Sequence, residues 1–148
     1  MSPEKTLEAL YSLDNHQAWL GAWEIVRAGN TLLDKEFLPN IKEIRSALNS
    51  LPNPLKPSVR DSRDIVRVAL HIPEIRNNNI CRCNIYPSTD QLLPKSQAKY
   101  GLVDILDAGE LSDAWEKKYT CKCKFCEQAF SVLENHGYHY PWSAWKKL

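Results

Sequence analysis

Residues 119–130 read YTCKCKFCEQAF, a run that places Cys121, Cys123 and Cys126 within six positions. Cys123 and Cys126 have the Cys-x-x-Cys spacing of a zinc knuckle, in which a tight turn points two thiolates at one metal ion. Structural Zn²⁺ takes four ligands in a tetrahedron, so this pair supplies half of a site. The other half is predicted at Cys81 and Cys83, which complete the five cysteines of the chain.

The spacing leaves the exact ligand set open. Neighbouring side chains of an extended chain point apart, so one of Cys81 and Cys83 is a candidate bystander. Cys121, His136 or His139 would then complete the tetrahedron. A redox role for the Cys-x-x-Cys pair is disfavoured because a strand, rather than the start of a helix, is predicted after it. Nucleophilic catalysis is disfavoured because no third residue is placed to orient a cysteine and a histidine.

Composition places the protein among ordinary globular chains. It has 148 residues, 43% hydrophobic and 25% charged, which predicts a single domain over 1–148. The net charge of +1 argues against nucleic acid or a membrane surface as the main partner, because both favour a clear basic excess.

The sequence also predicts a compartment. The start, MSPEKT, lacks the basic and apolar segments of a secretory signal, and we find no apolar run long enough to span a bilayer. An odd number of cysteines without an export signal fits thiols or metal ligands better than disulfides. We therefore expect a cytoplasmic protein.

The first third of the chain is predicted to be helical. Ser2 is placed as an N-cap, and Asp14 with Gln17 resembles a capping box. Apolar residues recur every three or four positions over 38–51, which is the pattern of one helix face. We expect a helical part over 1–51, followed by an extended proline-rich connector at 52–57.

The remainder, 58–148, is predicted to be a β-rich part clipped by zinc. Alternating apolar residues at 66–72 predict a strand, and 80–86 is expected to be a short strand or knuckle. Residues 87–98 are expected to form a loop, 110–118 a short helix, and 129–133 a strand. The predicted fold class is α+β: N-terminal helices, then a small antiparallel sheet with a zinc-ribbon-like cysteine cluster.

The C-terminal tail is rich in amphipathic aromatic residues, with Tyr138, His139, Tyr140, Trp142 and Trp145 in eight positions. These side chains have two interpretations. They could cover the sheet and the metal site, or they could form a partner-binding surface, because Tyr and Trp dominate protein-binding hot spots. We take them as the candidate partner-binding residues.

The pattern Trp115-x3-Tyr119-x-Cys121-x-Cys123-x2-Cys126-x3-Phe130, with the aromatic tail, resembles bacterial immunity proteins paired with polymorphic or contact-dependent toxins. The resemblance covers the last third of the chain. It implies a non-enzymatic protein, stabilised by zinc, that binds a cognate toxin and blocks it. The alternative is a zinc-ribbon nucleic-acid-binding or regulatory protein. A metal-dependent hydrolase would need an open metal position, which an all-sulfur site excludes.

Overall fold

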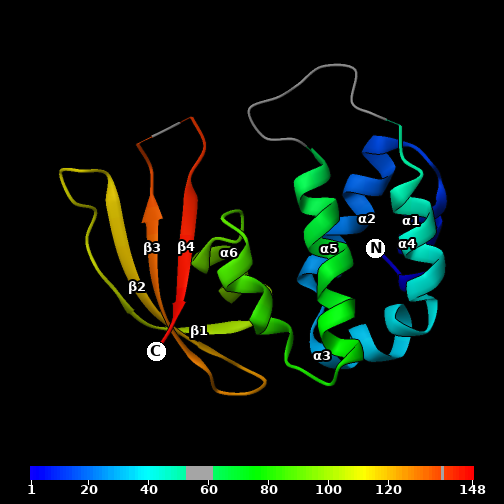
Figure 1. The fold of residues 1–148 in the computed structure, drawn as a ribbon. Coiled ribbons are helices and arrows are strands. Elements are labelled where there is room, and N and C mark those ends of the chain that lie inside the picture. Colours follow the sequence, from blue (N-terminus) through cyan, green and yellow to red (C-terminus); the bar gives the residue numbers. More distant parts are fainter. Residues whose placement is uncertain (53–61, 138) are drawn as a thin grey trace. The chain divides into compact units, whose positions relative to one another are not determined.

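The computed structural model describes residues 1–52, 62–137 and 139–148, and the chain forms two compact units, Met1–Arg82 and Cys83–Leu148 (Figure 1). The first unit is helical and the second contains an antiparallel sheet. The predicted α+β class, with helices preceding a small sheet and a cysteine cluster, is therefore confirmed. Apart from Pro52, the predicted connector at 52–57 lies outside the described residues.

The helical unit contains α1 (Pro3–Tyr11), α2 (Asn15–Arg27), the short α3 (Asn30–Leu32), a π-helical turn (Leu33–Phe37), a 3-10 turn (Leu38–Asn40), α4 (Ile41–Asn49) and α5 (Ser62–Asn77). Both predicted N-caps are confirmed: the Ser2 hydroxyl accepts the Lys5 N–H at 3.2 Å, and Asp14 Oδ1 accepts the Gln17 N–H at 2.8 Å. Of the described helices, none has the length and apolar character that crossing a membrane requires.

The strand predicted at 66–72 is wrong, because these residues belong to α5. This helix has more apolar residues than one buried face requires, and the extra ones produce an apparent alternation with a period of two. The helical period is instead carried by the polar side, where Asp64, Arg67, His71 and Glu74 follow one another at steps of 3, 4 and 3. Asp64 and Arg67 form an ion pair at 3.1 Å along this side. The β-rich part therefore begins later than the predicted residue 58.

The core of the helical unit lies where α2 packs against α1 and α5. Its fully buried side chains include Leu10, Ala18, Ala22, Ile25, Val26, Leu33, Phe37, Ile44, Ile65, Ala69 and Ile72. Gly21 allows α1 to approach α2 closely, because a Cβ at this position would lie 2.9 Å from Leu10 Cγ. The helices are therefore held mainly by an apolar interface, as burial on this scale favours.

The second unit contains η3 (Arg82–Ser88, a 3-10 helix that begins at the boundary), α6 (Pro94–Lys99), β1 (Val103–Ala108), β2 (Glu116–Cys123), β3 (Ala129–Asn135) and β4 (Trp142–Lys147). The strands form an antiparallel sheet in the order β1-β2-β3-β4 (Figure 1). The strand predicted at 129–133 is confirmed as β3.

Several local predictions in this unit differ from the structure. Of the two alternatives for 80–86, the strand is wrong, because the 3-10 helix η3 begins at Arg82, and the expected loop at 87–98 contains α6. The helix expected at 110–118 is replaced by a turn and the start of β2. The turn depends on Trp115, whose φ of 59° is incompatible with a continuing right-handed helix.

Three aromatic rings form the centre of the second core. Tyr86 stacks on Trp145 at a centroid distance of 4.1 Å, and Phe130 lies nearly perpendicular to both rings, at centroid distances of 5.5 and 5.6 Å. The indole N–H of Trp145 donates to the Leu92 carbonyl at 2.7 Å. This core brings η3 and the segment that follows it onto one face of the sheet.

Candidate metal centre and sheet pocket

The structure brings together the four cysteines that were predicted to bind metal. The sulfur atoms of Cys81, Cys83, Cys123 and Cys126 all lie within 4.8 Å of one another and could hold a metal ion. Cys83 Sγ and Cys126 Sγ are 3.4 Å apart. All five cysteines lie in the described part of the chain, and none forms a disulfide.

Cys81 is positioned by the end of α5 and by Asn30. Arg76, near the end of α5, donates a hydrogen bond to the Ile80 carbonyl at 3.0 Å. It also forms a bidentate ion pair with the Asp34 carboxylate, with N–O distances of 2.8 and 2.6 Å. This pair lowers the pKa of the Asp34 carboxyl, chiefly through the hydrogen bonds from Arg76. The Asn30 side-chain amide donates to Cys81 Sγ at 3.6 Å, so the residue before Cys81 and its sulfur are both held from the helical unit.

Arg82, between Cys81 and Cys83, is held by hydrogen bonds to the helical unit. Its guanidinium donates to the Ala28 carbonyl, its backbone N–H donates to Asn30 Oδ1 at 3.4 Å, and its side chain is buried. The two flanking cysteines can then share one site. Both cysteines therefore contribute sulfur atoms to the cluster.

Cys123 is the last residue of β2, and Cys126 lies in the turn that joins β2 to β3. The Glu127 N–H donates to the Cys123 carbonyl at 3.0 Å, and the Cys123 N–H donates to the Gln128 carbonyl at 2.9 Å, which closes the turn. The Phe125 N–H donates to Cys123 Sγ at 3.4 Å.

The three alternative ligands lie outside the cluster. Cys121 is completely buried in β2, and burial raises the pKa of its thiol to about 11, which keeps it protonated. His136 Nε2 lies 2.6 Å from Glu134 Oε1, and His139 is exposed in the turn between β3 and β4. Among the described residues, these side chains are not grouped with the four sulfurs.

The cluster has the dimensions of a tetrahedral centre. Zn–S bonds of about 2.3 Å place the sulfurs of a tetrahedral site about 3.8 Å apart. The observed upper bound of 4.8 Å and the 3.4 Å pair span that value. Sulfur donors select soft or borderline metals, with Zn²⁺, iron and Cu(I) as the usual occupants. The spacing of the four sulfurs is therefore compatible with a single metal ion bound by all four.

Replacing the cysteines one at a time by alanine will test the ligand set. We expect each of four substitutions to lower metal affinity by more than about 100-fold: Cys81→Ala, Cys83→Ala, Cys123→Ala and Cys126→Ala. Loss of a residue that only hydrogen-bonds to a metal ligand lowers affinity by up to about 100-fold, and loss of the ligand itself should cost more. The matched control is Cys121→Ala on the same strand, which should retain full metal content. Metal analysis of the purified variants decides it. Equal loss of metal in the control would contradict the assignment.

Glu127 adopts a strained backbone conformation directly after the knuckle, with φ of 64°. The left-handed region costs a non-glycine residue about 1–2 kcal/mol. We therefore expect Glu127→Gly to stabilise the metal-loaded protein by roughly 0.5–1 kcal/mol, after the extra chain entropy of glycine is subtracted. Denaturant unfolding measures this change. Lys124→Gly in the same turn is the control and should be destabilising, and equal destabilisation by both variants would refute the interpretation.

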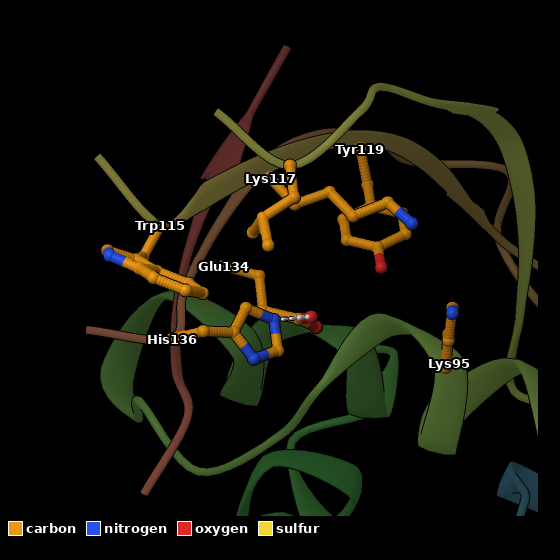
Figure 2. A pocket seen from close by; sticks show the side chains of 7 residues that line it. Lys95, Trp115, Lys117, Tyr119, Glu134 and His136 are labelled. Atoms are coloured by element: carbon orange, nitrogen blue, oxygen red, sulfur yellow. Dashed lines mark hydrogen bonds and ion pairs between the residues drawn. The ribbon is translucent and has the colours of Figure 1, made fainter. Parts of the chain in front are cut away.

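A second feature of this unit is a pocket of about 360 Å³ at the other end of β2 and β3 (Figure 2). Its lining residues come from α6, the turn before β2, and the two strands: Lys95, Leu111, Trp115, Lys117, Tyr119, Glu134 and His136. Lys117 is the cross-strand partner of Glu134, so the register of β2 and β3 places these opposite charges side by side.

Trp115 is exposed at 59% although it is the largest type of side chain. Its backbone is fixed on both sides, because its N–H donates to the Ser112 carbonyl at 3.0 Å and its carbonyl accepts the His136 N–H at 2.8 Å. A Cβ built on Gly137 would lie 3.9 Å from Trp115 Cβ, so the loop after β3 lies against it. The positive φ of Trp115, 59°, is a strained backbone conformation, and such strain concentrates at functional sites.

The structure separates the residues predicted to bind a partner. His139 is exposed, Tyr140 is exposed at 54%, and Trp142 is half-buried. Trp145 is 5% exposed and belongs to the aromatic core, which agrees with the interpretation that tail rings cover the sheet. Tyr138 lies outside the described residues.

Sequence reasoning missed the pocket, because its residues are spread over four segments. The one available signal was the alternation in β2, which puts Lys117 and Tyr119 on the face opposite Lys118.

Comparison of the chain with protein-family models, with curated proteins and with solved structures finds no match.

Proposed function

We propose that this protein is a non-enzymatic binding module whose second unit is stabilised by a structural Zn²⁺ ion. The observation that carries the proposal is the set of four converging cysteine sulfurs. Four thiolates fill the tetrahedral coordination of Zn²⁺ and leave no position for water or substrate, as in structural rather than catalytic sites. Thiolate ligands need a reducing compartment to stay unoxidised, so we place the protein in the cytoplasm.

The partner that we propose is a protein, a bacterial toxin that this chain neutralises as its immunity protein. Two kinds of support favour this choice. The segment from Trp115 to Trp145 resembles immunity proteins, and it carries the exposed rings of Trp115 and Tyr140. Exposed Trp and Tyr on a rigid support supply large contact area with little loss of side-chain entropy.

The experiment is reconstitution of a complex with the toxin domain encoded by the neighbouring gene. Size-exclusion chromatography and calorimetry should show a stoichiometric complex, and Tyr140→Ala should weaken it by about tenfold or more, as hot-spot residues do. Tyr11→Ala is the matched control, because Tyr11 is 37% exposed on the helical unit. A toxin that does not bind, or equal losses for both variants, contradicts the proposal.

A zinc-ribbon nucleic-acid-binding or regulatory protein is the alternative. The strand alternation that points Tyr119 into the core places Lys118 and Lys122 on the opposite face of the sheet, and Lys146 of β4 shares that face. Phosphate binding by these lysines would give affinity that falls steeply with salt, and each Lys→Gln change would reduce the slope of log K against log salt by about 1. A net charge of +1 favours the protein partner instead.

A further inference from the structure

The pocket in Figure 2 has an excess of positive charge at its rim. It is lined by the ammonium groups of Lys95 and Lys117 and by one carboxylate, Glu134. Glu134 is 5% exposed and already contacts His136 at 2.6 Å. In the described part of the chain neither lysine forms an ion pair, although Lys117 Nζ lies 5.2 Å from the centre of the Tyr119 ring. The two ammonium groups are therefore available to an anion.

Tyr119 supplies the second, independent indication of a ligand. Its side chain is 2% exposed, and its hydroxyl makes no hydrogen bond of ordinary geometry to a described residue, although the Glu134 carboxylate lies close enough to raise the pKa of the phenol. Figure 2 shows this hydroxyl directed toward the space between Lys95 and Glu134. Burial and the nearby Glu134 carboxylate raise the pKa of Tyr119, so the hydroxyl keeps its proton. Because buried polar groups are almost always paired, a buried donor directed into a pocket is expected to meet an acceptor there.

The other wall of the pocket is apolar. Leu111 and Trp115 are 48% and 59% exposed, and Trp115 is held by backbone hydrogen bonds on both sides. An indole face fixed in this way suits a flat ring, which stacks on it or meets it edge-on. The volume of about 360 Å³ lies at the lower end of the range for small-molecule sites, about 300–1,000 Å³.

We propose that this pocket binds a small molecule that carries an oxyanion on a flat ring. The ring lies against Trp115, and the oxyanion accepts hydrogen bonds from Tyr119 and from the ammonium groups of Lys95 and Lys117. A carboxylate and a phosphate ester share this chemistry. The site is separate from the sulfur cluster, because Lys117 and Cys123 lie toward opposite ends of β2.

The test is isothermal titration of the metal-loaded protein with four probes: phenyl phosphate, benzoate, phenol and inorganic phosphate. Ligands of this size make few contacts and can bind weakly, so the titrations extend to about 10 mM. We expect saturable binding of phenyl phosphate or benzoate, and the tighter of the two identifies the phosphate or the carboxylate class. Phenol should bind at least about tenfold more weakly, because it lacks the charge that the lysines recognise.

Variants connect the binding to the pocket. Lys117→Gln and Tyr119→Phe should each weaken the better probe by about tenfold, since each removes one hydrogen bond to a charged group. Lys118→Gln is the matched control on the opposite face of β2 and should leave binding within about twofold. Lys117→Gln decides the question if Tyr119→Phe fails to fold.

Trp115→Gly removes the ring wall at a position whose backbone suits glycine. It should weaken the ring-bearing probes and leave inorganic phosphate unchanged. Three results would overturn the proposal: no saturable binding of either aryl anion, equal binding of phenol, or equal losses in Lys117→Gln and Lys118→Gln.

Discussion

Removal of the metal will abolish the tertiary packing of Cys83–Leu148 and leave most of the helical signal of Met1–Arg82 intact. The expectation follows from the division into two compact units, of which the second contributes Cys83, Cys123 and Cys126 to the cluster. A structural Zn²⁺ contributes on the order of 10 kcal/mol or more of apparent binding free energy. That is as large as the whole free energy of unfolding of a typical domain, about 5–15 kcal/mol. The helical core is built from apolar contacts within its own unit and does not need the ion.

The measurement is circular dichroism at neutral pH before and after a strong chelator, with metal analysis to show that the ion has left. Near-ultraviolet signals from the Tyr86, Phe130 and Trp145 rings should collapse, whereas the far-ultraviolet helical signal should largely persist. Adding Zn²⁺ back should restore the aromatic signal. If metal-depleted protein kept its aromatic signal unchanged, the ion would have no structural role.

The cluster of four cysteines could be predicted from the sequence because its information is local. Two cysteine pairs with short spacings are rare outside metal centres, and four ligands are what zinc requires. The helix starts at Ser2 and Asp14 were equally local, since a cap depends on residues three positions apart. The Cys-x-Cys spacing could not decide whether the side chains of Cys81 and Cys83 lie in the same cluster. Their placement depends on the buried Arg82 and on Asn30, which is distant in the sequence.

The misassigned segments failed for a different reason. In α5 the apolar residues fit two periods, and the packing of this segment against α2 and α4 stabilises the helix. At 110–118 the pattern of Leu111 and Trp115 fitted a helix, but the positive φ of Trp115 breaks it. The pocket was beyond sequence reasoning, because strand register pairs Lys117 with Glu134 across β2 and β3. The register of two strands is set by tertiary packing, and shifting one strand by a single residue would move its side chains to the opposite face of the sheet.

Trp145→Ala will have the largest effect of any single substitution in the aromatic tail. Trp145 is 5% exposed, stacks on Tyr86 and donates its indole N–H to the Leu92 carbonyl. Truncation of a buried tryptophan to alanine costs about 3–5 kcal/mol through lost contacts and the remaining cavity. For a unit of this size, each kcal/mol lowers the melting temperature by about 4–8 °C. We therefore expect a fall of at least about 12 °C, or no folded second unit at all.

Trp142→Ala is the matched control for this effect, because strand alternation puts Trp142 on the opposite face of β4, where it is half-buried. Its removal should cost less than about 1 kcal/mol, as for surface positions with few contacts. Thermal unfolding of both variants in the metal-loaded state separates the two interpretations of the tail. A Trp145→Ala protein that melts like the parent but no longer binds its partner would place this ring in the binding surface and not in the core. The 5% exposure of Trp145 and its stacking on Tyr86 argue for the core, because a side chain with so little accessible surface has little to offer a partner.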